Sequence, residues 1–320
     1  MSCRVTIGKV QFDFVNSIHI RESIKLQSDT AKLTLPRNIS ALVAGRNESL
    51  ERKYLLDFIS VDDPVVIEQG YDGDLAVEFE GYVKDISADI PVLIECEDEM
   101  YQLRKSTFNT SFSSITLSEL LNYVAPEYEH EIIDDVNLGK FIISNASAFD
   151  VLESIRKKHL HSYFKAGKLV VGFPVDIKPG VKHQYNLQRN VRDAQQLHFL
   201  KAKDVKLQIK GISNNRDGTK IVETVGEPGG ATRTLNFSNM TRDELRNITL
   251  KNYNSLSFDG WKGSFSAFGL PRTKAGDGIE LTDPEYPDGS REGSYLVESV
   301  DNNFTPTTGW ERIVKPSLSI

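Results

Sequence analysis

The sequence predicts an α+β fold that is mainly β, in which two antiparallel barrel-like modules flank a small α/β insert. Three observations support this expectation. Apolar and polar residues alternate in many short segments, turn residues recur about every 8–12 residues, and the spacing becomes helical in the middle of the chain. The 320 residues fit two or three domains at roughly 100–200 residues each. We expect a first β-barrel module at 1–105, the α/β insert at 106–180, and a second β-barrel module with one helix at 181–320.

Residues 63–104 show the strand pattern of the first module most clearly. Apolar side chains occupy alternate positions of the central segment, which predicts a strand with one buried face. The apolar set is Leu75, Val77, Phe79 and Val83, and the polar set is Glu78, Glu80 and Lys84. Short strands at 64–67 and 92–96 complete a meander. Further strands are expected at 4–15, 18–27 and 31–36, followed by a polar loop at 37–53.

Three expected helices begin with the same capping chemistry. In a capping box, a Ser or Thr and an acidic residue three positions later satisfy free backbone amides at the helix start. The pairs are Thr116 with Glu119, Ser147 with Asp150, and Thr241 with Glu244. The first two boxes predict helices of the insert, the second of which should end near His161, before a hairpin at 163–171. The third box predicts the helix of the second module.

Alternation returns after Leu197 and predicts the strands of the second module. They are expected at 205–209, 222–225, 261–267, 278–282, 293–301 and 310–316. The glycine-rich segment 226–230 lacks the Lys-Ser/Thr pair of a phosphate-binding loop, so we expect it to form a hairpin tip.

The two β modules contain segments that resemble each other. Asp63-Pro-Val-Val-Ile aligns with Asp277-Gly-Ile-Glu-Leu, and Gly81-Tyr-Val-Lys-Asp-Ile aligns, within about one residue, with Ser294-Tyr-Leu-Val-Glu-Ser. The separations from Asp63 to Tyr82 and from Asp277 to Tyr295 are 19 and 18 residues. Two interpretations remain open: any two antiparallel hairpins look alike at so few positions, or the chain holds two related modules.

Composition excludes several classes of function. The formal net charge is −7 and no basic run exceeds the pair Lys157-Lys158, so we do not expect binding to nucleic acid by charge neutralisation. No apolar run approaches the ~20 residues that cross a bilayer, and the N-terminus lacks the apolar core of a signal peptide. We therefore expect synthesis in a cytoplasm. Cys3 and Cys96 are the only cysteines, which excludes a disulfide framework and a cysteine zinc site.

Clusters of reactive side chains give no positive argument for an enzyme. Glu95 and Glu97, in the acidic group 95–99, share the outer face of a predicted strand, so we expect a solvated surface rather than paired catalytic carboxylates. His159 and His161 are two apart on a predicted helix and therefore make a poor metal pair. We predict no catalytic, cofactor-binding or metal-ligating residues.

The order of elements and several short motifs resemble a known family. The motifs are Asp63-Pro-Val-Val-Ile, Phe79-Glu-Gly-Tyr-Val-Lys-Asp-Ile, Ile115-Thr-Leu-Ser-Glu-Leu-Leu, Tyr163-Phe-Lys-Ala-Gly-Lys-Leu, and the C-terminal run Asp277-Gly-Ile-Glu-Leu to Gly309-Trp-Glu-Arg. Together they resemble the baseplate hub proteins of contractile phage tails, the late control gene D family, which is related to the N-terminal part of type VI secretion spike proteins. The resemblance covers nearly the whole chain.

The resemblance implies a structural virion protein of the tail baseplate, made in the cytoplasm of a bacterial host. It implies a homotrimer with two barrels per chain, which gives a pseudo-sixfold ring that matches a sixfold tail tube. The implied partners are the tail tube protein, a separate spike protein and other baseplate proteins. DNA would pass through the lumen without specific binding, because acidic walls repel phosphates.

The expected contact surfaces are the barrel edges and the protruding hairpins. We predict interface residues in the segment Arg21–Leu35 and at the 226–230 tip. The candidates are Arg21, Lys25, Leu33, Leu35, Glu227 and Pro228.

A β-rich glycan-binding or glycan-cleaving protein is the alternative. Exposed aromatic side chains stack on sugar rings, and this chain offers Trp261 and Trp310, with Tyr71 and Tyr286. Packing of the same rings in a core or at its rim is the competing interpretation.

Overall fold

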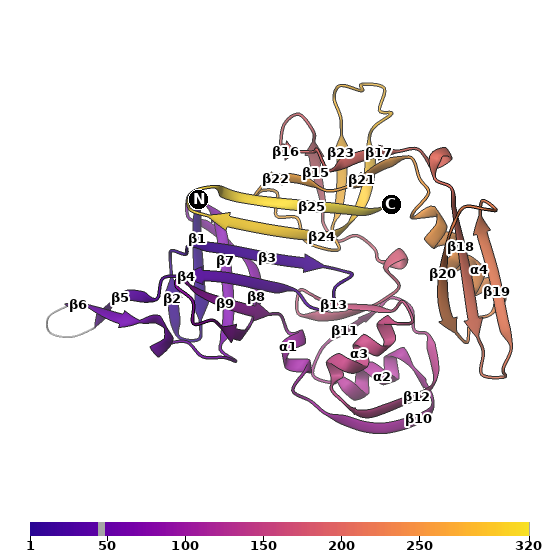
Figure 1. The fold of residues 1–320 in the computed structure, drawn as a ribbon, viewed down its shortest axis with the longest axis horizontal. Helices are drawn as coiled ribbons and strands as arrows, with labels where there is room; N and C mark the ends of the chain where they lie inside the picture. The colour runs from indigo at the N-terminus through magenta and orange to yellow at the C-terminus, as the bar shows by residue number, and fades with distance from the viewer. Residues whose placement is uncertain (44–48, 320) are drawn as a thin grey trace. The chain divides into compact units, whose positions relative to one another are not determined.

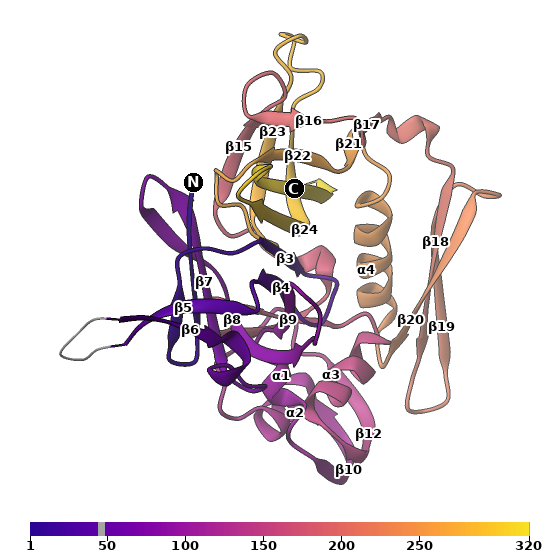
Figure 2. The ribbon, with the colours of Figure 1, turned by 60° about the vertical axis from the view of Figure 1, so that its left-hand side comes forward.

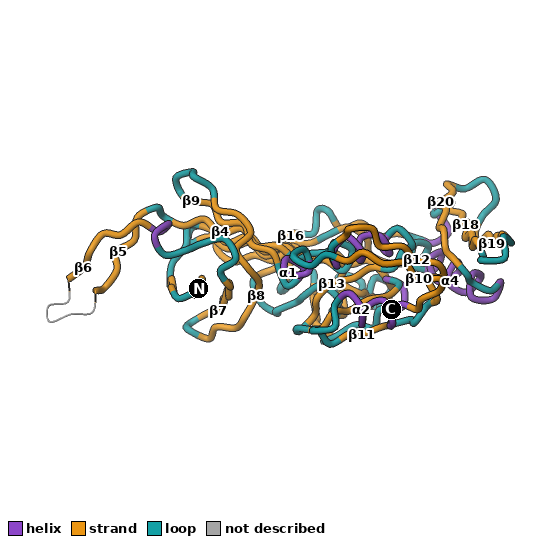
Figure 3. The backbone as a smooth tube through the Cα atoms, turned by 90° about the horizontal axis from the view of Figure 1, so that it is seen from below, coloured by secondary structure: helices purple, strands orange, loops and turns teal. Residues whose placement is uncertain are grey.

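The computed structural model describes residues 1–43 and 49–319. Strands hold 51% of the chain and helices 14%, and Figure 3 shows how few helical segments interrupt the strands. The expectation of a mainly β protein with large antiparallel sheets is confirmed. Among the described residues no closed barrel is found, so the barrel form of the two modules remains a prediction.

The chain forms two compact units. Unit 1 contains Met1–Glu22, Ser28–Tyr101 and Asp301–Arg312; unit 2 contains Ser23–Gln27, Gln102–Val300 and Ile313–Ile320. The last two strands, β24 (Gly293–Thr305) and β25 (Gly309–Ser319), contribute residues to both units. The division into 1–105, 106–180 and 181–320 stays a prediction, and it did not anticipate that 301–312 belong with the N-terminal residues.

Unit 1 is built on an antiparallel sheet with the strand order β24-β3-β4-β9-β8-β7-β1-β2 (Figure 1). Its elements are β1 (Ser2–Ile7), β2 (Val10–Phe12), β3 (Ser17–Ser23), β4 (Thr30–Leu35), β5 (Asn38–Val43), β6 (Ser49–Tyr54), the 3₁₀ turn η1 (Leu55–Asp57), β7 (Pro64–Tyr71), β8 (Asp74–Ile86) and β9 (Val92–Glu97). The short helix α1 (Met100–Leu103) begins in unit 1 and ends in unit 2.

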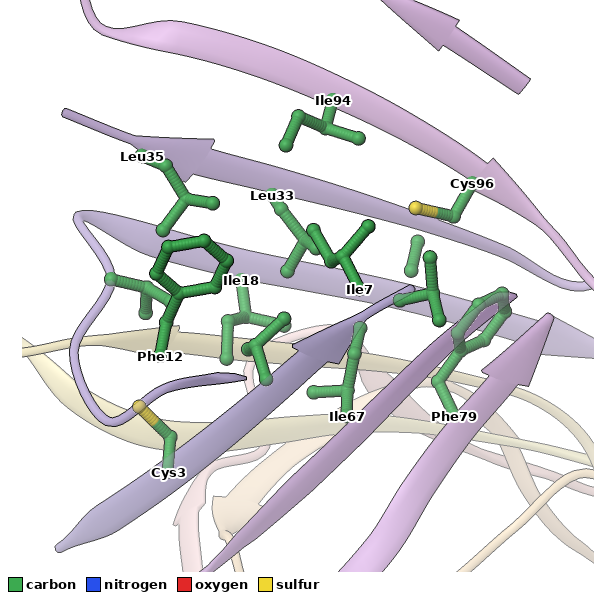
Figure 4. Packing of buried hydrophobic residues seen from close by; sticks show 14 of the residues in the cluster. Cys3, Ile7, Phe12, Ile18, Leu33, Leu35, Ile67, Phe79, Ile94 and Cys96 are labelled. Atoms are coloured by element: carbon green, nitrogen blue, oxygen red, sulfur yellow. The ribbon is translucent and has the colours of Figure 1, made fainter. Parts of the chain in front are cut away.

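The core of unit 1 lies inside this sheet. Figure 4 shows the side chains of Leu33, Leu35 and Ile94, from β4 and β9, on one side of the core, and those of Ile67 and Phe79, from β7 and β8, on the other. These five side chains are at most 4% exposed. The sheet therefore folds over its own apolar face, as the alternating strands require.

Two expectations for unit 1 are wrong. The polar segment 37–53, expected as a loop, contributes β5 and β6, which pair antiparallel from Asn38 opposite Tyr54 to Val43 opposite Ser49; residues 44–48 lie outside the described part. In β8, a register shift opposite Ile67 and Glu68 inserts Glu78 as an extra residue. The bulge interrupts the alternation of faces, so Glu78 is 1% exposed beside buried Phe79, and Val77 before it is 40% exposed.

Unit 2 combines several small sheets, four strands of the largest sheet (β15, β16, β22 and β23) and the helices α2, α3 and α4. Its strands are β10 (Phe108–Thr116), β11 (His130–Ile132), β12 (Asn137–Ala146), β13 (His161–Lys165), β14 (Lys168–Gly172), β15 (Lys182–Asn186), β16 (Val191–Asp193), β17 (Leu197–Leu200), β18 (Leu207–Asn214), β19 (Lys220–Gly226), β20 (Ala231–Ser238), β21 (Gly260–Gly263), β22 (Phe265–Phe268) and β23 (Gly278–Thr282). Its helical elements are α2 (Leu117–Val124), α3 (Ala148–Arg156), α4 (Arg242–Asn254) and the 3₁₀ turns η2 (Pro174–Asp176) and η3 (Ala202–Asp204).

The helices of unit 2 begin where the sequence predicts. Thr116, Ser147 and Thr241 are the N-cap residues, and each forms both halves of its capping box. The predicted hairpin is confirmed as β13 paired with β14. Helix α3 ends at Arg156 rather than near His161, so His159 follows the helix and His161 begins β13.

The strands β18, β19 and β20 form a three-stranded sheet with α4 against it, as Figure 2 shows. β18 lies in the centre, antiparallel to β19 and parallel to β20. Residues 226–230 therefore cross the end of β18, where Glu227 N–H donates to Leu207 O at 3.0 Å. The expectation of a hairpin tip at 226–230 is wrong, because β19 and β20 do not pair with each other.

Candidate interaction surfaces

Four of the six predicted interface residues have accessible side chains. Arg21 is exposed on β3 with its Nε 3.9 Å from Asp301 Oδ1. Glu227 and Pro228 are exposed where the chain crosses β18. Lys25 has a side chain that is 48% exposed and pairs with Glu298. Contact of these residues with a partner stays a prediction.

Leu33 and Leu35 do not lie on the surface. Both are 0% exposed in the core of unit 1, because they occupy the inward positions of β4, where residues alternate between core and solvent. The candidate interface is corrected accordingly: these two side chains are not available to a partner in the folded unit.

Unit 1 contains a turn built around Asp63 at the start of β7. The Asp63 carboxylate accepts the Ser60 N–H at 2.7 Å, and Asp63 N–H donates to Ser60 O at 3.2 Å. Asp62 adopts a positive φ of 77°. Two backbone bonds join the turn to β8: Asp62 N–H donates to Val83 O, and Val83 N–H donates to Asp63 O, both at 2.9 Å.

Unit 2 repeats this turn around Asp277 at the start of β23. The Asp277 carboxylate accepts the Lys274 N–H at 3.0 Å, and Asp277 N–H donates to Lys274 O at 3.1 Å. Gly276 takes the positive φ, at 81°. Gly276 N–H donates to Val297 O at 2.9 Å, and Val297 N–H donates to Asp277 O at 2.8 Å.

The two turns share one residue spacing. Asp63 to Val83 and Asp277 to Val297 are both separated by 20 residues, so the alignment made from the sequence is correct within one residue. Hydrogen bonds at four equivalent positions are more specific than a general likeness between hairpins. This geometry favours the second of the two interpretations, related segments in the two units.

The surroundings of the two aspartates differ. Asp277 also contacts His183 Nε2 at 3.0 Å and Lys165 Nζ at 3.6 Å. Burial opposes ionisation of Asp277, but the bonds from His183 and the Lys274 N–H, together with the Lys165 charge, leave its pKa below the usual value. Asp277 is therefore an ionised and buried carboxylate within unit 2.

A buried polar network lies in the centre of unit 1. Arg312 Nη2 donates to Glu78 Oε2 at 2.7 Å, and both side chains are 1% exposed. Asn302 Nδ2 donates to Gln69 Oε1 at 2.8 Å, and its Oδ1 accepts from Trp310 Nε1 at 2.7 Å. No local sequence pattern indicates this network, because Glu78 and Arg312 are 234 positions apart.

The acidic group at the end of β9 is only partly a solvated face. Glu95 pairs with Lys32 at 2.6 Å and has a side chain that is 37% exposed. Glu97, expected on the same outer face, is 1% exposed and pairs with Lys84 Nζ at 2.9 Å. Burial raises the pKa of neighbouring Asp98 to about 7, against hydrogen bonds from Asp29 N–H and Met100 N–H. The two ion pairs therefore link β9 to both of its neighbours, β4 and β8.

The tryptophans that suggested sugar binding are buried. Trp261 is 7% exposed and donates from Nε1 to Arg291 O at 2.8 Å; Trp310 is 2% exposed. Tyr71 packs beside Trp310 with ring centroids 5.3 Å apart. Neither indole offers a face to a sugar ring, so the rings belong to packed cores, which was the competing interpretation.

Unit 2 has a pocket of about 430 Å³ lined by both polar and apolar side chains. Asp134 and Asp176 meet in it, and Lys251 pairs with Asp176. Burial and the neighbouring Asp176 raise the pKa of Asp134. Within the described residues, no group of three or more His, Cys, Asp or Glu is arranged to hold a metal ion. In that same part of the chain, no helix is long and apolar enough to cross a membrane.

Comparison with known proteins gives matches in structure alone. No protein family and no curated sequence matches the chain. Its structure is similar to the 43 kDa tail protein of prophage MuSo2 from Shewanella oneidensis, with 15% identity over 99% of this chain and 98% of that one, at a TM-score of 0.63.

Two further solved structures are similar. One is the Escherichia coli c3393 protein, a type VI secretion component with structural similarity to the bacteriophage T4 tail proteins gp27 and gp5; it is 9% identical, with 98% of this chain and 76% of that one covered, at a TM-score of 0.59. The other is a chain of the Francisella PdpA-VgrG complex, 9% identical over 99% of this chain and 58% of that one, at 0.54. The chain therefore has the fold of these proteins, and the phage tail protein among them agrees with the resemblance to baseplate hub proteins.

Proposed function

We propose that this protein is the structural hub of a phage tail baseplate or a related contractile injection system. Three copies form a pseudo-sixfold ring that joins the tail tube to a central spike, and the mechanism is interface geometry without catalysis. The main support is the extent of the fold match: nearly the entire chain corresponds to nearly the entire prophage tail protein. A match of this extent favours a tail component over a protein that merely shares one common β domain.

The spike partner is supported by the matches from secretion systems. One matched chain belongs to a complex that contains the spike protein VgrG, and c3393 resembles two T4 tail proteins. These properties belong to those proteins. Since this chain has their fold, we propose a spike protein and other baseplate proteins as its neighbours.

The trimeric ring is supported by the repeated turn. If Asp63 and Asp277 mark equivalent segments of two related modules, three chains supply six such segments, which suits a sixfold tube. Three chains at −7 each carry a formal charge of −21. We propose that DNA crosses this ring without specific binding, repelled by the excess negative charge, and that the protein is located in the virion after synthesis in the host cytoplasm.

Two measurements test this proposal. Light scattering after gel filtration, with spike protein present, should give three chains of this protein per complex. Tail tube protein from the same genome should be captured by the immobilised protein and should not be captured by an unrelated acidic β protein. A complex of one chain with no capture of tube protein contradicts the hub. Binding to polysaccharide without tube binding would instead favour the glycan alternative.

A further inference from the structure

Unit 1 exposes a pair of large apolar side chains shortly before its Asp63 turn. Tyr54 is 59% exposed and Leu56 is 41% exposed, while Leu55 between them is 0% exposed. Since Leu55 enters the core, the residues on either side of it face solvent. The pair lies where β6 ends and η1 begins.

Unit 2 exposes a similar pair before its Asp277 turn. Phe268 is 49% exposed and Leu270 is 40% exposed, and Gly269 between them is buried. Phe268 ends β22, and the Arg192 guanidinium lies 5.4 Å from the centre of its ring. Arg192 covers part of the ring and leaves half of the side chain accessible.

The two pairs stand at equivalent positions of the repeated segment. Tyr54 and Phe268 each precede the turn aspartate by nine residues (54 to 63 and 268 to 277), and Leu56 and Leu270 precede it by seven (56 to 63 and 270 to 277). The next exposed apolar residue of unit 1, Phe58, has no such counterpart, because Arg272 occupies its position in unit 2. The shared feature is thus an aromatic residue, a buried residue and a leucine.

Single exposed apolar residues are ordinary on protein surfaces. An exposed aromatic–leucine pair that recurs in two units, at the same distance from the same turn, calls for a common cause. Packing within each unit does not supply it, since all four side chains face solvent. A binding partner that presents the same binding site more than once explains why the pair recurs.

We propose that Tyr54–Leu56 and Phe268–Leu270 are two copies of one contact patch that binds identical subunits of a homo-oligomeric protein. This inference rests on the proposed function, under which that oligomer is the tail tube. Each pair inserts an aromatic ring and a leucine into an apolar site on one tube subunit; aromatic residues are enriched in the buried centres of protein interfaces. Each chain therefore binds two tube subunits.

Three serine variants test the patches. They are the double variants Tyr54→Ser/Leu56→Ser and Phe268→Ser/Leu270→Ser, and the quadruple variant that combines them. Matched controls are Val77→Ser in unit 1 and Val222→Ser in unit 2, which remove apolar side chains that are 40% and 39% exposed. Circular dichroism and thermal unfolding check that every variant is folded, which is expected because the changed side chains are exposed.

Binding to purified tube protein is measured by titration calorimetry. The wild type should bind two tube subunits per chain. Each double variant should bind one with unchanged affinity or lose about tenfold or more in overall affinity, the quadruple variant should lose about 100-fold or more, and the controls should stay within about threefold.

The outcomes separate the inference from the function on which it rests. If the wild type binds no tube protein, both the proposed tube partner and the binding role of the patch are wrong. If the wild type binds and the quadruple variant binds as tightly as the controls, the hub proposal survives and the patch inference is overturned. Loss of binding through only one of the two pairs overturns their equivalence.

Discussion

One inserted residue, Glu78, decides how the centre of unit 1 is built. The bulge in β8 turns Glu78 inward, where it meets Arg312 at 2.7 Å. Sequence analysis placed Glu78 on the outer face, because alternation appears unbroken on both sides of it. The bulge has no local signature in the sequence, and Arg312, the partner of Glu78, is 234 positions away.

Replacing Arg312 by Met tests the importance of the buried pair. The variant leaves the Glu78 carboxylate buried without its cation, which should lower the free energy of unfolding by about 3–5 kcal/mol. Urea unfolding followed by tryptophan fluorescence measures the change. The exposed pair of Lys32 and Glu95 is the control, since Lys32→Met should cost about 1 kcal/mol or less. Equal effects of the two substitutions would argue against a structural role for the buried pair.

Asp98 should make the stability of unit 1 depend on pH. Burial raises its pKa from the ordinary value of 3.8 to about 7, so the folded state binds a proton that the unfolded state releases. The stabilisation is complete below about pH 4 and is lost as the pH rises through about 7. Urea unfolding between about pH 4 and 8 should show a smaller decrease in stability for Asp98→Asn than for the wild type.

The control for this pH dependence is Asp217→Asn. Asp217 is an exposed turn residue whose pKa is lowered by the Thr219 hydroxyl, so its removal should not flatten the decrease. If the stabilities of the wild type and of Asp98→Asn depend on pH in the same way, the raised pKa of Asp98 is contradicted.

Elements with local causes were predictable, and elements with distant causes were not. The capping boxes at Thr116, Ser147 and Thr241 define helix starts through residues three positions apart, so the sequence contains the whole cause. The crossing at 226–230 arises because β20 pairs with β18 rather than with β19. The glycine-rich sequence of 226–230 is equally compatible with a hairpin. The β5–β6 hairpin was missed because β6 is largely polar, although Ile39, Ala41 and Val43 occupy alternate positions of β5.

The candidate contact surface shows the same limit. Sequence alignment found Asp63 and Asp277, but it did not show that each carboxylate accepts a backbone N–H three residues earlier. Leu33 and Leu35 were assigned to the interface although their parity in β4 indicated the core. The pairs at Tyr54 and Phe268 had no visible signal until the structural spacing of the repeat was known.

The two turn aspartates should differ in their contribution to stability. Asp63→Ala removes one acceptor from a turn near the surface and should cost about 0.5–1.5 kcal/mol. Asp277→Ala also leaves His183 and Lys165 without their carboxylate and should cost about 2–4 kcal/mol. Thermal unfolding of both variants measures the difference. A larger effect at Asp63 would mean that the additional partners of Asp277 contribute nothing.

At the scale of the whole molecule, the two units share the C-terminal strands. Residues 301–312 provide Asn302, Trp310 and Arg312 to unit 1, while Val314 packs in a core of unit 2. Composition and periodicity could not predict this sharing. They indicate that a segment is a strand, but they do not indicate to which unit the strand belongs. Both ends of the chain therefore determine whether unit 1 is complete.

Truncation after Val300 should prevent unit 1 from folding. The deletion removes Phe304 and Trp310 from its core and leaves Glu78 without Arg312. Hydrogen exchange should then show rapid exchange in β1, β7 and β8, with protection retained in α2 and α3. Truncation after Ser317 keeps every residue of unit 1 and is the control. Slow exchange in β7 of the shorter protein would show that residues 1–101 fold without the C-terminus.

The sharing of β24 and β25 has a consequence on the ribosome. The N-terminal strands emerge first, yet the segment that completes their sheet is translated some 200 residues later. At about 5–20 residues per second, this interval lasts roughly 10–40 s. During that time the nascent chain displays an unfinished apolar surface, which makes it a client for chaperones and delays assembly until residues 301–312 have left the ribosome.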